Sequence, residues 1–536
     1  MIDVKRMRTV LFVLCVAGFS VLSAFYLSKE KSYCLGVPFI NENGIARIGE
    51  YSRTDLQKDI LFMDMPVAVD TQSDTVYISQ NMDGTTLYTE LEGELTAKDE
   101  KYPLYFAKDS AFDDFPQAVE YGHGFSLIVD TLDGKYMKYN VVFTNLPVIK
   151  MSGEKAYVNS EKRRVYAGDV TVWDPEYEKT GKYCVQSSLV EWHRRGGSTL
   201  TDDKKSWKLA LKNADGTNND LEFLGLEDGD DDWILNAIHR DDTKIREKLV
   251  MTIWNEYCDT AVYNHKMSAG RYAEVVNNGQ YCGLYLLQRR IDGKYLELED
   301  EILLKSIKAT EGLPIEFFYD IIYPRVEQTE RDDPLQDNLS DDERYIYNLM
   351  EPFHNEEFGN LIDMDNWMDV SLLIDFGYMS DNTGAKNVFY LLNNHPDNLK
   401  IKQILWDTDY SFGIGYSDGF AHKPESAATG RRERREADYL RQLYPDFEKM
   451  MAERWFKMRT SIFEEENVYS VMDDCVGEIT LCGAYGREKE LWGSYYAGGT
   501  DTIEAMYDYI EKRIEYLDSC YKTAIYYKNL QKGMQK

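Results

Sequence analysis

The sequence WDTDYSFG occupies residues 406–413 and directly follows a strand-like run, LKIKQIL, at 399–405. Two aspartates, Asp407 and Asp409, therefore stand at the end of a segment that is predicted to be a buried strand. Isolated buried carboxylates are costly, so such a pair needs a partner: a metal cation, a basic side chain or a set of backbone N–H groups. Other parts of the chain have to identify that partner.

A second strand-like run, VFYLL at 388–392, is predicted to form a hairpin with LKIKQIL. Asp381 stands six residues before Asn387, which directly precedes this run. Because antiparallel neighbours bring the start of one strand beside the end of the other, we expect Asp381, Asn387 and Asp407 at one end of the hairpin. An aspartate there can act as a base toward a substrate hydroxyl, and an amide oxygen can bind Mg²⁺. Capping of a helix end is the alternative role for Asp381 and Asn387.

A glycine-rich segment, EWHRRGGSTLTDDKKSWKLALK, covers residues 191–212. Its centre, Gly196 to Thr199, predicts a tight loop whose backbone N–H groups can cradle phosphate oxygens. Lys204 and Lys205 then open a predicted strand, on which neighbouring side chains point to opposite faces. The glycine pair alone is also typical of an ordinary turn.

These segments together resemble the spore-coat protein H (CotH) kinase family. Members typically show an RGNS-type loop, KKSY, an LRNKLA-like helix, NGEYxGLYLL and WDxDxxxG. In that order, this chain has RRGGST, KKSW, IREKLV (245–250), NGQYCGLYLL (278–287) and WDTDYSFG. The resemblance covers about residues 145–526. It implies an atypical secreted protein kinase with a reduced kinase-like fold, which uses ATP and a divalent metal ion.

The resemblance implies a role for each acidic residue of the hairpin. Asp381 would be the catalytic aspartate. Asn387 and Asp407 would hold Mg²⁺ or Mn²⁺, and Asp409 is a second candidate ligand.

The resemblance also implies a set of nucleotide-binding residues. Lys205 would contact the phosphates, with Lys208 as its rival on the opposite strand face. Arg246 would face the cleft if its helix packs like a kinase regulatory helix, and would otherwise lie on the surface. Two departures stand out: Gly197 replaces the loop asparagine, and Arg289 in LLQRRI replaces an acidic residue, which puts the adenine-side contacts in doubt. The other candidates line the phosphate loop: Arg195, Gly196, Ser198 and Thr199.

The chain begins like an exported protein. Basic residues precede an apolar run at 9–27, whose length is near the roughly 20 residues that span a bilayer. A cleaved signal peptide and an uncleaved membrane anchor are both consistent with it. We therefore expect an extracytoplasmic protein that is secreted or membrane-anchored, with the spore coat as one destination.

The order of strand-like and helix-like segments predicts a mixed architecture of strands and helices. Short runs at 75–80, 86–91, 125–130 and 139–144 suggest a small all-β domain, such as a sandwich. Further strands to about residue 212, a helix at 234–258 and a helical second half suggest a two-lobed α+β domain with a cleft. The predicted helices of the second half are 341–359, 366–380, 437–466, 468–484 and 501–526. The predicted domains are 1–34 (signal or anchor), 35–144 (β-rich), 145–526 (kinase-like) and 527–536 (polar tail).

Bulk properties limit the partners. The net charge of -32 argues against a nucleic-acid-binding surface. The sequence contains no C-x-x-C pair, so a zinc site is not predicted. Cys475 and Cys482 could form a disulfide or remain buried thiols. The run RRERRE at 431–436 fits either docking of an acidic or phosphorylated substrate or a solvated helix face.

Three functions compete on this reading. The first is transfer of the ATP γ-phosphate to Ser or Thr of a surface or coat protein. The second is a structural or adhesion protein that keeps a kinase-like scaffold without catalysis. The third, a carboxylate-metal hydrolase, fits the two aspartates but leaves the lysine and the glycine loop unused. The substrate and the oligomeric state cannot be deduced from the sequence.

Overall fold

The computed structural model describes most of the chain between residues 33 and 534. Within that span it leaves out residues 54–58, 109–114, 121, 123, 160–161, 227–228, 262–264, 309–317, 324–343, 345–347, 349–359, 383–386, 394, 396–397, 416–418, 421 and 427–439. The apolar run at 9–27, most of the predicted helix at 341–359 and the RRERRE run lie outside the described residues. Those predictions stay predictions.

The chain separates into two compact units. The first is built from residues up to 67 together with 73–76 and 84–142, and the second from 68–72, 77–83 and 143 onward. The chain passes from the first unit to the second between residues 142 and 143.

The first unit is largely β. Strand β10 pairs antiparallel with β9 and β11, and β4 pairs antiparallel with β5 and β8. Two short helices, α2 and α3, mean that the unit is not all-β, and the predicted strand at 86–91 is wrong because those residues lie in turns and loop. The elements are β1 (Tyr33–Cys34), β2 (Val37–Pro38), α2 (Glu42–Ile48), β3 (Glu50–Tyr51), β4 (Ile60–Phe62), β5 (Met65–Pro66), β8 (Leu95–Ala97), β9 (Leu104–Lys108), α3 (Phe115–Glu120) and β10 (Phe125–Asp130); β6 (Ala68–Asp70), β7 (Thr75–Ser79) and β11 (Lys135–Thr144) include residues of the second unit.

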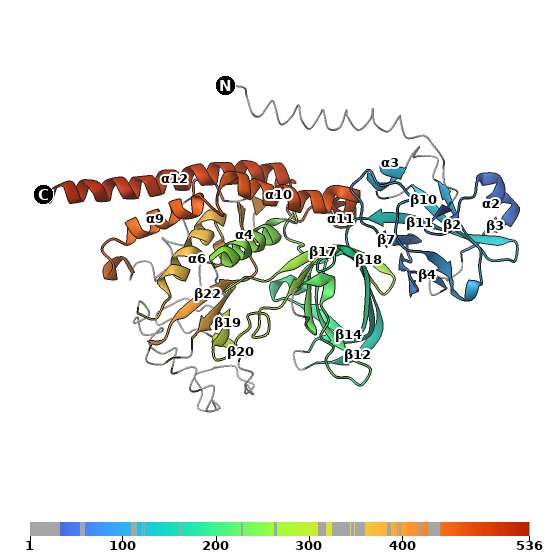
Figure 1. Cartoon of the computed structure of the whole chain (residues 1–536), viewed down its shortest axis with the longest axis horizontal. Helices are drawn as coiled ribbons and strands as arrows, with labels where there is room; N and C mark the ends of the chain where they lie inside the picture. The colour runs from blue at the N-terminus through green and yellow to red at the C-terminus, as the bar shows by residue number, and fades with distance from the viewer. Residues whose placement is uncertain are drawn as a thin grey trace, which may run out of the picture. The chain divides into compact units, whose positions relative to one another are not determined.

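A closed β-barrel forms the first part of the second unit (Figure 1). The strand order is β12-β13-β14-β15-β16-β18-β17, and a parallel pair between β12 and β17 closes the barrel. Strand β15 shows why the sequence folds this way: Trp207, Leu209 and Leu211 alternate into the barrel core. The strands are β12 (Val148–Val158), β13 (Arg164–Tyr177), β14 (Lys182–Arg195), β15 (Ser206–Lys212), β16 (Asp232–Asn236), β17 (Gly270–Asn277) and β18 (Gln280–Arg289).

The first part of the predicted helix at 234–258 is wrong, because residues 234–236 belong to strand β16. Trp233 and Leu235 point into the barrel core, whereas Ile234 packs in a separate cluster outside it. This alternation has a period of two, so Ile234 belongs to a strand. The helix α4 begins only at Arg246 and continues to Ala261.

A second sheet and a set of helices complete the unit (Figure 1). The sheet order is β20-β19-β21-β22. Residues on one face, such as Val388, join the helices in one large core, whereas Phe389 and Trp406 pack on the other face. The elements are β19 (Ile302–Lys308), β20 (Phe318–Tyr323), α6 (Met364–Gly377), β21 (Val388–Leu392), β22 (Ile401–Leu405), β23 (Ile414–Gly415), β24 (Gly419–Phe420), α9 (Phe447–Arg459), α10 (Glu465–Thr480), α11 (Ala484–Trp492) and α12 (Ile503–Met534).

Two further predictions can be compared with the described residues. All seven described cysteines are free, so Cys475 and Cys482 are buried thiols and not a disulfide. Helix α12 continues to Met534, so most of the predicted tail at 527–536 is helical. Within the described part of the chain, no helix combines the length and the apolar character that a membrane crossing requires.

Candidate active site

The β21–β22 hairpin brings the predicted acidic residues to one end. Val388 pairs with Leu405, and the Trp406 N–H donates to the Asn387 carbonyl oxygen at 2.9 Å. The Asn387 side-chain amide in turn donates to a carboxylate oxygen of Asp381 at 2.8 Å. Asp381 and Asn387 are thereby fixed beside the residue that precedes Asp407.

A further asparagine closes this end of the hairpin. The buried Asn382 side chain donates to the carbonyl oxygens of Asn387 at 3.2 Å and Trp406 at 2.9 Å. Asn387 and Asp407 both have left-handed backbone conformations, with φ of 55° and 58°. Asn and Asp tolerate this conformation better than most residues, which suits them to the points where the two strands end.

Several carboxylates influence one another at this site. Burial raises the pKa of Asp409 well above its usual range, and the charges of Asp407, Glu247 and, more weakly, Asp381 add to that shift. The half-buried Asp381, Asp407 and Asp409 therefore share one electrostatic environment. Neighbouring carboxylates thus oppose the ionisation of Asp409.

Glu247, in the first turn of α4, is a member of the site that the sequence did not indicate. Its pKa is raised to about 7, first by burial and then by the charge of Asp407. Gln288 and Asn236 donate hydrogen bonds to its two carboxylate oxygens at 2.7 and 2.8 Å. Only the fold brings these strands to the start of α4, so local sequence carries no signal for this contact.

Arg195 supplies a positive charge beside these carboxylates. It ends β14, and its guanidinium lies 5.6 Å from the Trp406 ring. Burial lowers the pKa of Arg195, and the charges of Asp407 and Glu247 oppose that shift. The predicted first residue of the phosphate loop is therefore close to the predicted metal ligands.

The glycine loop directly follows Arg195. A Cβ on Gly196 would lie 2.0 Å from the Thr199 hydroxyl oxygen, and the φ of 115° there also favours glycine. Ser198 begins a short 3₁₀ turn. Among the described residues, no protein group accepts a hydrogen bond from the backbone N–H of Ser198 or Thr199. These donors can serve a phosphate oxygen, as the sequence predicts.

Lys205 binds the loop itself. Its ammonium group donates to the carbonyl oxygens of Leu200, at 2.9 Å, and Asp202. The strand begins only at Ser206, so the argument that Lys204 and Lys205 occupy opposite strand faces does not apply. In this arrangement Lys205 supports the shape of the glycine loop from within.

The other two lysines are ion-paired. Lys204 is fully buried, and its ammonium lies 2.7 Å from a carboxylate oxygen of Glu488. This ion pair lies in the protein interior. Lys208 is partly exposed and lies 2.9 Å from Asp232.

Arg246 is neither exposed nor open to a ligand. Its guanidinium is fully buried and pairs with Asp241 at 2.5 Å and Asp501 at 2.6 Å. It also donates to the Ser411 carbonyl oxygen at 2.9 Å. The surface position predicted as the alternative is therefore wrong: the side chain ties the start of α4 to the segment after the two aspartates.

Arg289, the departure in LLQRRI, lies on the opposite face of β18 from Gln288, which contacts Glu247. The Arg289 guanidinium is buried 3.2 Å from an oxygen of Asp230 and close to the Trp233 and Tyr295 rings. Neighbouring strand residues point in opposite directions, so this departure leaves the Glu247 side unchanged.

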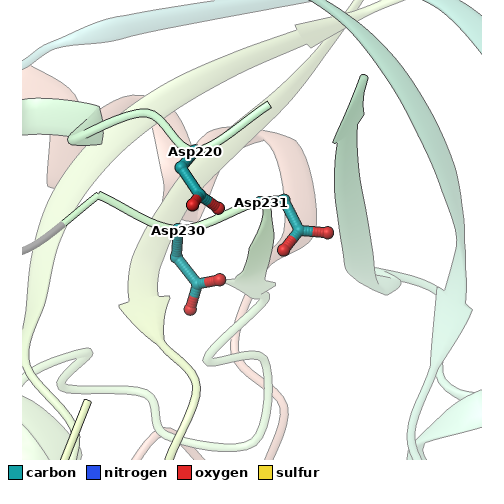
Figure 2. Close-up of side chains that lie close together, drawn as sticks. All are labelled: Asp220, Asp230 and Asp231. Atoms are coloured by element: carbon teal, nitrogen blue, oxygen red, sulfur yellow. The ribbon is translucent and has the colours of Figure 1, made fainter. Parts of the chain in front are cut away.

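A different acidic group is more tightly packed (Figure 2). Among the described residues, Asp220, Asp230 and Asp231 form the group of metal-capable side chains whose ligand atoms all lie within 4.8 Å. Asp381, Asp407 and Asp409 do not approach one another that closely. However, Arg289 pairs with Asp230, and Lys294 lies 2.7 Å from Asp220.

Comparison with known proteins agrees with the motifs. The family model described as CotH kinase protein matches residues 193–517, more than half of the chain. The chain belongs to the CotH kinase family. The match begins inside β14 and contains the glycine loop, α4, the hairpin and the helices up to α12. A comparison with curated proteins finds no match.

Proposed function

We propose that this CotH kinase family member is an ATP- and metal-dependent atypical protein kinase. Family membership supports a kinase-like protein, and the two parts of the second unit suit a reduced two-lobed kinase fold. In this proposal the barrel supplies the glycine loop, and the second sheet with its helices supplies the acidic residues.

The gathering of carboxylates at the hairpin end is the observation that carries the proposal. The charges of Asp407, Glu247 and Asp381 add to the raised pKa of Asp409, and the charge of Asp407 adds to the raised pKa of Glu247, which Arg195 opposes. Carboxylate and amide oxygens are the ligands that Mg²⁺ and Mn²⁺ take in proteins. A divalent cation held by Asn387, Asp407 and Asp409 would relieve this repulsion.

Each residue then has one task. A bound Mg²⁺ or Mn²⁺ neutralises charge on the ATP phosphates during phosphoryl transfer. The N–H groups of Ser198 and Thr199 donate to phosphate oxygens, and Lys205 keeps their loop in shape. Asp381, oriented by the Asn387 amide, accepts the proton of the acceptor hydroxyl.

The acceptor and the location extend the proposal. We infer Ser or Thr hydroxyls of surface or spore-coat proteins as acceptors, because the family takes its name from a coat protein. The N-terminal basic and apolar residues support an extracytoplasmic protein, with the membrane as a partner if that segment is retained.

A scaffold without catalysis is the competing function. A structural protein gains nothing from several repelling carboxylates at one hairpin end, since burying such groups costs free energy. A carboxylate-metal hydrolase would need the same acidic residues but not the open N–H donors of the glycine loop.

Thermal unfolding with and without nucleotide tests the proposal. We expect ATP with Mg²⁺ or Mn²⁺ to raise the melting temperature, and ATP with excess EDTA to leave it unchanged. Incubation with labelled ATP and a generic protein acceptor should then transfer label. A metal-dependent ATP shift without any transfer, to acceptor or to the protein itself, would favour the scaffold.

A further inference from the structure

Arg240 lies between β16 and α4 and is almost completely buried. Its guanidinium makes a bidentate contact with Asp202: Nε donates to one carboxylate oxygen and Nη2 to the other, both at 2.8 Å. Asp202 directly follows the 3₁₀ turn that begins at Ser198. One end of the glycine loop is thereby fixed to a side chain outside it.

The remaining nitrogen of Arg240 connects two separate segments. Nη1 donates to the Ser198 hydroxyl oxygen and to the Tyr410 hydroxyl oxygen, both at 3.2 Å. Ser198 belongs to the glycine loop, and Tyr410 directly follows Asp409. A single planar group therefore contacts the proposed phosphate loop and the segment that carries the proposed metal ligands.

We propose that Arg240 is a positioning residue for nucleotide binding, which holds the glycine loop in place relative to the Asp407–Tyr410 segment. This inference rests on the proposed function. A phosphate chain that bridges loop and metal needs both at a fixed separation, and ordering a loose loop on binding costs entropy. The guanidinium offers donors in a rigid fork, which lysine cannot reproduce.

If Arg240 had a purely structural role, its replacement would lower the stability of the protein without specifically loosening the glycine loop. The pair formed by Arg271 and Asp174 provides a matched control, because it is also bidentate, at 2.9 and 3.2 Å, and also lies in the second unit. Its arginine touches none of the proposed site residues in the described hydrogen bonds. Arg271→Lys therefore measures how much stability the protein loses when a bidentate arginine–carboxylate contact is removed away from the site.

Amide hydrogen exchange and ATP kinetics of the full chain test the inference. Arg240→Lys should speed exchange in residues 196–202 and leave residues 206–212 unchanged. We expect the KM for ATP to rise about tenfold, with a smaller change in kcat, since hydrogen bonds to charged groups are the stronger kind. Tyr410→Phe removes one hydroxyl and should raise KM by about two- to tenfold.

The outcomes separate the two proposals. Arg271→Lys should keep the wild-type KM and loop exchange. If Arg240→Lys does not fold, Tyr410→Phe decides through the same two measurements. Wild-type exchange and KM in a folded Arg240 or Tyr410 variant would overturn the inference alone, whereas a wild-type protein that does not respond to ATP and metal would overturn both.

Discussion

Two acidic groups in the second unit look alike in sequence but differ in their surroundings. Asp220, Asp230 and Asp231 lie closer together, yet Lys294 and Arg289 pair with two of them. At the hairpin end, the charges of Asp407 and Glu247 add to the raised pKa of Asp409, and the Arg195 guanidinium interacts electrostatically with Asp407. The tighter group therefore already has cationic side-chain partners, whereas at the hairpin end neighbouring carboxylates act on Asp409.

Asp407→Ala should have the largest effect. The variant should lose the metal-dependent ATP shift and all phosphoryl transfer, because a proposed ligand is removed. The apo protein should unfold at an equal or higher temperature, since one repelling charge is gone. Asp231→Ala, in the compensated group, serves as the control and should keep the full shift. A wild-type shift in Asp407→Ala would move the ligand role to Asp409.

Asp381→Asn separates catalysis from metal binding. The substitution keeps the size and removes the charge, so ATP affinity should stay within a few-fold of wild type. Turnover should fall by roughly two to four orders of magnitude, the usual range for a positioned general base. Steady-state kinetics and nucleotide titration measure the two quantities. Parallel loss of both would make Asp381 a metal ligand and leave the base unidentified.

Lys204→Ala and Lys205→Ala compare an interior ion pair with a loop contact. Removing Lys204 leaves Glu488 buried, although Lys244 remains 3.4 Å away, so unfolding should require about 3 kcal/mol less free energy. Lys205→Ala should change stability by less than about 1.5 kcal/mol and raise the KM for ATP. Urea unfolding and ATP kinetics distinguish the two. Equal stabilities would contradict the burial of Lys204.

The smallest predicted effect concerns pH. Burial and Asp407 raise the pKa of Glu247 to about 7, so the folded apo protein holds a proton that the unfolded chain has released. Stability of the apo protein should therefore decrease as pH rises from about 5 to 7, by on the order of 1–2 kcal/mol. A bound cation favours the ionised carboxylates, so the shift caused by Mg²⁺ with ATP should be larger at pH 8 than at pH 6. A pH-independent shift would place Glu247 outside the metal's influence.

Local patterns predicted the hairpin and several helices. The strands at 388–392 and 399–405 match β21 and β22. These features depend on neighbouring residues, whose alternation and turn chemistry are visible in the sequence. The same holds for Asp381 and Asn387, which lie six residues apart and share a side-chain hydrogen bond.

Features that depend on distant contacts could not be predicted. The barrel closes through Val148 and Glu274, which are far apart in the sequence. Glu247 joins the site through Gln288, and Arg240 joins the glycine loop to Tyr410. Nothing near these residues in the chain indicates their partners, because tertiary contacts alone create them.

The barrel also determines which fragment of this protein can be prepared. A fragment cut at the family match, residues 193–517, would lack β12, β13 and most of β14. Strands β15 and β17 would each lose one neighbour, β15 most of β14 and β17 all of β12, and unpaired strand edges with exposed apolar side chains promote aggregation. The fragment would also lose Tyr521, whose ring stacks on Trp455 at 5.3 Å. A soluble preparation should therefore begin before Val148 and continue past Tyr521.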